Sequence, residues 1–251
     1  MCFKKIVRPL LRRIPSTVST NSRTLVDNRH SMIQGSDPVV VAPVGKHTSS
    51  LIFFHGLGDQ GHSWADAFRH SIKLPNTNVI CPNSADRPVT LNMGMRMPAW
   101  FDLLGLTPES GEDGPGILEA AKYVHTLIDN EIAKGIAPER IVVAGFSMGG
   151  ALALYAGLVY PKPLAGVVGL STFLCQRAAI PQNVVANKSV PVFLGHGTND
   201  FLLPHAIGKM TETHLKAFNP NVEFHSYPGM EHSSCQQELA DVVVFLKKVI
   251  P

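Results

Sequence analysis

From about residue 39 to the end of the chain, short apolar runs alternate with longer segments of helical periodicity. The runs are bounded by Gly, Pro or Asn, and most lack alternating polar residues, which is typical of strands in a parallel sheet covered on both faces. This alternation predicts an α/β fold: a mostly parallel central sheet with helices on both faces, wound by right-handed crossovers. The predicted strands are residues 51–55, 79–82, 141–146, 165–170, 190–196 and 222–227, and the predicted helices lie near 62–72, 116–134, 148–160, 205–218 and 234–250.

The composition fits a single folded domain. With 45% hydrophobic and 16% charged residues, the 251-residue chain is too apolar for a disordered protein and long enough for one full core. Its longest apolar stretch, residues 148–160, is shorter than the roughly 20 residues that a membrane-spanning helix needs. Cys2, Cys81, Cys175 and Cys235 form no CxxC pair and no metal-ligand spacing, so we expect reduced thiols and no metal site. We expect no cofactor either.

Residues 1–35 are expected to form a flexible N-terminal extension, and residues 36–251 the folded α/β domain. Residues 1–26 hold six basic residues and no acidic residue, so the charge of this segment alone exceeds the formal net charge of +3 for the whole chain. The rest of the chain is therefore net negative, which argues against a nucleic-acid partner.

The extension fits three interpretations. Its Arg-rich, Ser-rich and acid-free sequence is typical of an organelle transit peptide, so a mitochondrial address is one alternative. Cys2 beside Lys4 and Lys5 also fits an acylated anchor on a cytoplasmic, peripherally membrane-attached protein. The third interpretation is an unstructured tail that carries no address.

A G-x-S-x-G pentapeptide, Gly145-Phe-Ser147-Met-Gly149, joins a predicted strand to a predicted helix. In a nucleophile elbow the serine occupies a sharp turn, and small neighbours let the strand and the helix approach without clash. The turn also places the serine at a helix N-terminus, where free N–H groups favour negative charge. The pattern predicts Ser147 as the nucleophile of a serine hydrolase with the α/β-hydrolase fold.

The loops after the last two predicted strands supply an acid and a base. In this fold the order along the chain is nucleophile, acid, histidine. Asp200 follows the strand at 190–196 and His232 follows the strand at 222–227, at the strand ends where open α/β sheets bind ligands. We predict His232 as the general base and Asp200 as the group that orients its ring.

Two backbone N–H groups are expected to stabilise the developing oxyanion. One belongs to Met148, directly after the nucleophile. The other is assigned to Leu57, in the glycine-rich loop at residues 55–61 after the first core strand. That loop lacks the GxxxxGK[ST] and GxGxxG patterns of phosphate sites. His55 and His196 are expected to be structural or supporting residues.

Residues 87–112 interrupt the alternation and show no clear secondary-structure element. A long apolar loop in a compact domain is typical of a lid or a functional surface. Its several methionines suit an adaptable wall around a flexible apolar ligand. The alternative is a loop that simply packs on the core.

Five segments together resemble the acyl-protein thioesterases, also called lysophospholipase-like carboxylesterases. They read FFHGLGDQGHSW, RPVTLNMGMRMPAWFDLLGL, GFSMGGALALY, HGTND and PGMEHSSCQQE, and they span nearly the whole body of the chain. The resemblance implies a monomeric or weakly dimeric α/β-hydrolase that cleaves S-acyl thioesters, typically palmitoyl-cysteine on proteins, and often lysophospholipid esters. It places the triad on Ser147, Asp200 and His232, with oxyanion donors at Leu57 and Met148.

Two sites differ from the usual family pattern. Met148 stands where many members have Gln and is shared with a branch of short-chain esterases, and Phe201-Leu-Leu-Pro204 replaces a more usual Pro-Leu-Val-Pro. A lysophospholipase or short-chain carboxylesterase therefore stays open beside a depalmitoylase, and a non-catalytic acyl-binding protein is the interpretation from another class. The residues expected to form the acyl groove are Leu91, Met93, Met97, Trp100, Phe201 and Leu202.

Overall fold

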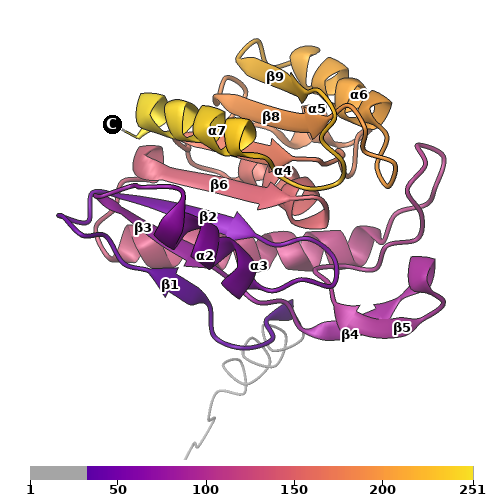
Figure 1. Cartoon of the computed structure of the whole chain (residues 1–251), viewed down its shortest axis with the longest axis horizontal. Helices are drawn as coiled ribbons and strands as arrows, with labels where there is room; N and C mark the ends of the chain where they lie inside the picture. Colours follow the sequence, from indigo (N-terminus) through magenta and orange to yellow (C-terminus); the bar gives the residue numbers. More distant parts are fainter. Residues whose placement is uncertain (1–32, 251) are drawn as a thin grey trace, which may run out of the picture.

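The computed structural model describes residues 33–250 (Figure 1). The predictions for the N-terminal extension, including Cys2 and the basic residues, therefore lie outside the described residues except at positions 33–35. These three residues belong to the body: Ile33 is buried, and the Gly35 N–H donates to the Asn83 carbonyl at 2.9 Å. Among the described residues, no helix has the length and apolar character needed to cross a membrane.

A seven-stranded sheet lies at the centre of the molecule, in the order β1-β3-β2-β6-β7-β8-β9. Neighbouring strands are parallel except for the edge pair β1–β3, which is antiparallel. The six predicted strands are confirmed, with ends shifted by two residues at most. The strands are β1 (Val39–Val41), β2 (Ser49–Phe54), β3 (Thr77–Cys81), β6 (Ile141–Phe146), β7 (Gly166–Leu170), β8 (Val192–Gly197) and β9 (Val222–Tyr227).

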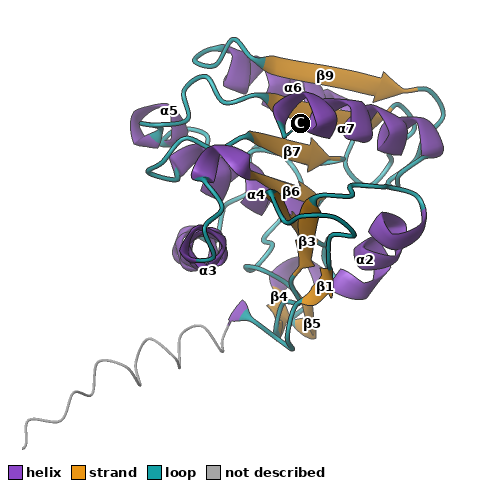
Figure 2. Cartoon of the chain, turned by 90° about the vertical axis from the view of Figure 1, so that its left-hand side faces the viewer, coloured by secondary structure: helices purple, strands orange, loops and turns teal. Residues whose placement is uncertain are grey.

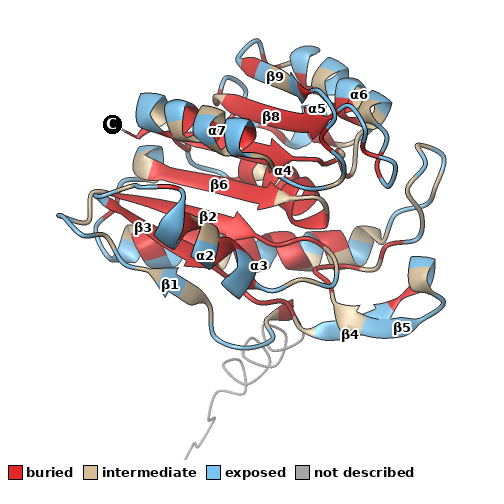
Figure 3. Ribbon diagram, viewed as in Figure 1, coloured by how far each residue is buried: buried red, intermediate tan, exposed pale blue. Residues whose placement is uncertain are grey.

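Helices cover both faces of this sheet, as predicted (Figure 2). One face carries α2 (Gly61–His70) and α7 (Gln236–Val249); the other carries α3 (Gly114–Ala133), α4 (Met148–Val159), α5 (Ile180–Asn183) and α6 (His205–Lys216). Because successive strand residues point to opposite faces, β2 contributes to both cores. Phe53 packs on Trp64 with ring centroids 4.3 Å apart, and Phe54 packs on Trp100 at 5.1 Å. The central strands are buried along most of their length (Figure 3).

The sheet order changes direction at β2. The chain leaves β2 through α2 to reach β3 on one side, and it later returns through α3 to β6 on the other side. In open α/β sheets, ligands bind in the crevice at the carboxyl ends of the two strands that flank such a point. The loop after β2 carries Leu57 and the turn after β6 carries Ser147. The topology therefore places the predicted oxyanion loop beside the predicted nucleophile.

The expectation of no element in residues 87–112 was wrong, because a β-hairpin occupies the first part of this interval. Strands β4 (Asp86–Val89) and β5 (Met95–Pro98) pair antiparallel around the short 3₁₀ turn η1 (Thr90–Asn92) and project from the sheet (Figure 1). Each strand has only four residues and includes a proline, which argues against a strand at the level of sequence.

A buried carboxyl group lies between α7 and the sheet. Glu238 is fully buried, and among the described residues its carboxylate oxygens have no hydrogen-bond partner. Its Oε1 lies 2.4 Å from the position that a Cβ atom would take at Gly195 of β8, so any side chain at position 195 would force the carboxyl group to move. Burial, with a smaller contribution from Asp241, raises the pKa of Glu238 from 4.5 to about 8. The folded protein therefore favours the neutral acid.

We predict that Glu238→Gln stabilises the fold more at pH 8 than at pH 5. Between the unfolded pKa near 4.5 and the folded pKa of about 8, unfolding releases a proton, so the wild type loses stability as pH rises through this window. The amide cannot ionise and avoids that loss. Urea unfolding at both pH values measures the difference, with the exposed Glu139→Gln as control. An equal effect of Glu238→Gln at the two pH values would contradict the prediction.

Candidate active site

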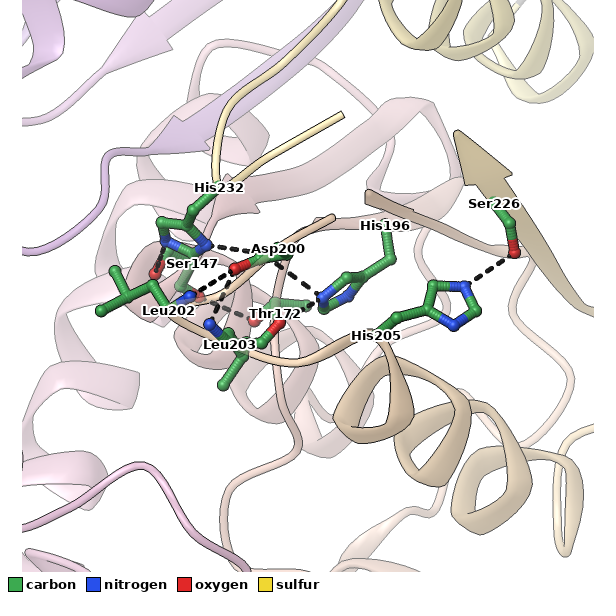
Figure 4. Close-up of polar contacts among 9 residues, drawn as sticks. All are labelled: Ser147, Thr172, His196, Asp200, Leu202, Leu203, His205, Ser226 and His232. Carbon is green, nitrogen blue, oxygen red and sulfur yellow. Dashed lines mark hydrogen bonds and ion pairs between the residues drawn. The ribbon is translucent and has the colours of Figure 1, made fainter. Parts of the chain in front are cut away.

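The structure brings the three predicted triad residues into one hydrogen-bonded line (Figure 4). The His232 Nε2 atom lies 3.0 Å from the Ser147 Oγ atom, and His232 Nδ1 lies 2.7 Å from Asp200 Oδ2. An ionised carboxylate only accepts hydrogen bonds, so Nδ1 carries the proton and Nε2 is free to accept one from the serine hydroxyl. His205, which follows Asp200 closely in the sequence, lies apart from this line, and its Nε2 atom lies 2.8 Å from Ser226 Oγ.

Ser147 occupies the strained turn that a nucleophile elbow requires. Its backbone has φ 52° and ψ −120°, a region that residues other than glycine seldom adopt. The Ser147 N–H donates to the Leu170 carbonyl at 2.8 Å, and the Thr172 hydroxyl donates to the Ser147 carbonyl at 2.7 Å. Residues at and just after the end of β7 therefore bind both the N–H and the carbonyl group of the strained Ser147. Thr172 was not among the predicted site residues, and no motif points to it.

Two glycines allow the strand and the helix of the elbow to pack closely. A Cβ atom on Gly149 would lie 2.2 Å from the Phe54 carbonyl oxygen and 2.4 Å from that of His55. A Cβ atom on Gly145 would lie 2.3 Å from the Gly149 carbonyl oxygen. The first turn of α4 therefore lies directly against the end of β2, at a distance that only glycine permits.

We predict that Gly149→Ala lowers both stability and activity. The added methyl group must push α4 away from β2, and overpacking of this kind costs about 1–3 kcal/mol. Because α4 carries Ser147 at its N-terminus, kcat/KM for a nitrophenyl ester should fall at least about tenfold as the elbow shifts. The control is Gly114→Ala in α3, where a Cβ atom would have an ordinary contact of 3.7 Å. Wild-type stability and activity in Gly149→Ala would refute this account.

Asp200 is held by backbone donors as well as by His232. Its side chain is buried, and Oδ1 accepts the N–H groups of Leu202 at 3.1 Å and Leu203 at 2.7 Å. His196 Nε2 lies 3.5 Å from Asp200 Oδ2 and donates to the Leu203 carbonyl at 2.8 Å. Burial lowers the pKa of His196, which favours a neutral ring, so this contact is not an ion pair. Asp200 is thus fixed with one oxygen directed at His232.

An apolar pocket of about 190 Å³ opens beside the serine. Of the predicted residues, Leu57, Met148, Leu91 and Leu202 line it together with Ser147 and His232. Gly56 and Asp59 also line it, and five further apolar residues contribute to its wall: Leu103, Leu106, Phe146, Phe173 and Leu203. Leu103 and Leu106 belong to the long apolar interval, and Phe146 lies inside the G-x-S-x-G motif, but only the fold shows that their side chains converge on one pocket.

Four predicted groove residues do not line this pocket. The Trp100 assignment was wrong: its side chain is fully buried in the core, where the indole Nε1–H donates to the His55 carbonyl at 2.9 Å. Met93 is 89% exposed at the tip of the hairpin and Phe201 is 83% exposed. Met97 is half-buried against the core. An apolar run in the sequence does not tell a pocket wall from a core contact or an exposed rim.

Comparison with known proteins places the chain in a family. Residues 36–250 match the family model described as phospholipase/carboxylesterase. The chain belongs to this family. With the strained serine and its histidine and aspartate partners, it is a serine hydrolase of the α/β-hydrolase fold.

Several relatives are similar over nearly their whole length. The chain is 42% identical to acyl-protein thioesterase 1 of Gibberella zeae, over 85% of this chain and 96% of that protein. It is 44% identical to acyl-protein thioesterase 1 of Mycosarcoma maydis, over 82% and 93% respectively. The crystal structure of Zea mays acyl-protein thioesterase 2 superposes with a TM-score of 0.80 at 31% identity, covering 86% of this chain and 100% of that one.

Proposed function

We propose that the protein hydrolyses S-acyl thioesters on proteins through an acyl-enzyme on Ser147. The observation that carries the proposal is the Ser147–His232–Asp200 line opening directly into an apolar pocket. An acyl chain can occupy the apolar wall while its carbonyl carbon faces the serine. The relatives named acyl-protein thioesterase support the thioester as the substrate class.

In the first half of the reaction, Ser147 Oγ attacks the thioester carbonyl carbon while His232 Nε2 takes its proton. The carbonyl oxygen becomes an oxyanion, which the N–H groups of Leu57 and Met148 stabilise. Both residues line the pocket, and a Cβ atom on Gly56 would lie 3.4 Å from the Ser147 Cβ. Losing one such donor typically costs about 3 kcal/mol of transition-state stabilisation. Collapse of the intermediate breaks the C–S bond, and His232 returns the proton to the leaving sulfur.

In the second half, water attacks the acyl-serine ester and gives a proton to His232 Nε2. The second tetrahedral intermediate uses the same two N–H donors. Breaking the C–O bond releases the carboxylic acid, and the proton returns to Ser147 Oγ. Asp200 stabilises the charged imidazole in both halves, since its Oδ2 stays bonded to Nδ1. No step requires a group outside the chain and the water.

A lysophospholipase or short-chain carboxylesterase activity is the second candidate. The description of the matched family, phospholipase/carboxylesterase, favours it, and the same triad cleaves oxygen esters by the same steps. The length of acyl chain that the pocket accepts separates the two candidates.

We predict that turnover of S-acyl peptides rises with chain length from C2 towards C16. Each methylene that enters the apolar pocket can add about 0.8 kcal/mol, or roughly fourfold in kcat/KM. Ser147→Ala should reduce hydrolysis to background, because the variant lacks the hydroxyl group that lies 3.0 Å from His232 Nε2 and forms the acyl-enzyme. Thiol release measures both effects, with glycerol lysophospholipids of matched chain length as the comparison. An optimum at C2 to C4, or faster turnover of the lysophospholipids, would move the assignment to the second candidate.

A further inference from the structure

The mechanism above gives no role to the buried histidine His55, although it lies in the loop next to Ser147. His55 follows β2 and is fully buried. Its Nδ1 lies 2.7 Å from the Gly56 carbonyl oxygen, and its Nε2 lies 3.2 Å from the Ser84 backbone nitrogen. A backbone N–H can only donate, so Nε2 is the acceptor and Nδ1 carries the proton. His55 therefore donates to the Gly56 carbonyl. Burial lowers the pKa of His55, in keeping with a neutral ring.

The Gly56 carbonyl and the Leu57 N–H belong to one peptide unit. Among the described residues every peptide bond is trans, so the carbonyl and the N–H of this unit point in opposite directions. The imidazole holds the carbonyl on its own side, and the N–H is consequently directed the other way. Gly56 is in close contact with the elbow, since a Cβ atom built on it would lie 3.4 Å from Ser147 Cβ. The direction of this peptide decides where the Leu57 donor points.

The residues on both sides of the Gly56–Leu57 peptide are also held in place. The Trp100 Nε1–H donates to the His55 carbonyl at 2.9 Å, and the indole ring lies 4.8 Å from the imidazole between centroids. Gly58, with φ 76°, closes a turn in which the Asp59 N–H reaches the Gly56 carbonyl at a longer 3.2 Å. His55 is thus held by the core and in turn holds the loop.

We infer that His55 is a positioning residue of the oxyanion hole: its Nδ1–H fixes the Gly56–Leu57 peptide so that the Leu57 N–H is directed at the oxyanion. The inference rests on the proposed serine mechanism. It assigns the buried histidine a role in transition-state stabilisation, beyond holding the loop to the core. His55 itself touches no reacting atom.

Two substitutions separate the two ring nitrogens. In His55→Asn the amide nitrogen lies near the position of Nδ1 and can donate to Gly56. In His55→Gln the longer side chain reaches the position of Nε2, where it can accept from Ser84 and leaves Gly56 without its imidazole donor. Each variant keeps one of the two hydrogen bonds, so they form a matched pair.

We expect His55→Gln to lower kcat for an S-acyl peptide by about 10- to 100-fold, part of the roughly 10²- to 10³-fold loss that follows removal of an oxyanion donor. KM should change by less than about twofold, because a misdirected donor weakens the transition state rather than substrate binding. His55→Asn should keep kcat within about fivefold. A long-chain alkyl trifluoromethyl ketone, which forms an oxyanion on the serine, should lose affinity for the Gln variant by the same factor as kcat/KM.

Urea unfolding of both variants separates positioning from stability. Comparable stability with unequal kcat supports the inference. Equal losses of kcat in the two variants, or unchanged ketone affinity in His55→Gln, would overturn it. If the Gln variant does not fold, the Asn variant decides: a folded His55→Asn that has lost kcat contradicts the inference, and one that retains kcat and ketone affinity supports it. An inactive wild type would instead show that the proposed function has failed.

Discussion

The approach of α4 to the end of β2 determines most of what the site can do. Because Gly149 has no side chain, the first turn of the helix rests on the carbonyl groups of Phe54 and His55. That contact brings the loop after β2 within reach of the elbow after β6, although about ninety residues separate them in the sequence. The two N–H groups that we propose as oxyanion donors, those of Leu57 and Met148, belong to these two loops. A wider spacing between strand and helix would move Ser147 away from the proposed donor at Leu57, whereas Met148 moves together with the serine.

The sequence predicted every strand of the described sheet except the short edge strand β1, and it predicted the three triad residues, because both follow from local rules. A buried parallel strand is a short apolar run, and an elbow needs glycine at fixed offsets from its serine, so Ser147 is recognisable within five residues. Asp200 and His232 follow from the order of the loops after known strands. These features depend on chain order and backbone sterics, which a single sequence displays.

The pocket wall was harder to predict, since it depends on which way side chains point. Trp100 and Leu103 lie three residues apart in one apolar interval, yet the first packs in the core and the second lines the pocket. Thr172 and Phe173 follow β7 without any motif, and they become site residues only because β7 lies next to β6. The β4–β5 hairpin was missed because proline in a short strand is a strong signal for a loop.

The base of the triad depends on the last strand of the sheet. In the described sheet β9 pairs with β8 alone, and His232 lies on the connection from β9 to α7. Edge elements open locally at lower free energy than central ones. Fraying of β9 and α7 would therefore remove the base while β6 and its strained serine stay folded. During synthesis Ser147 is likewise made well before His232, so the triad can be complete only after β9 and the loop that follows it have been made.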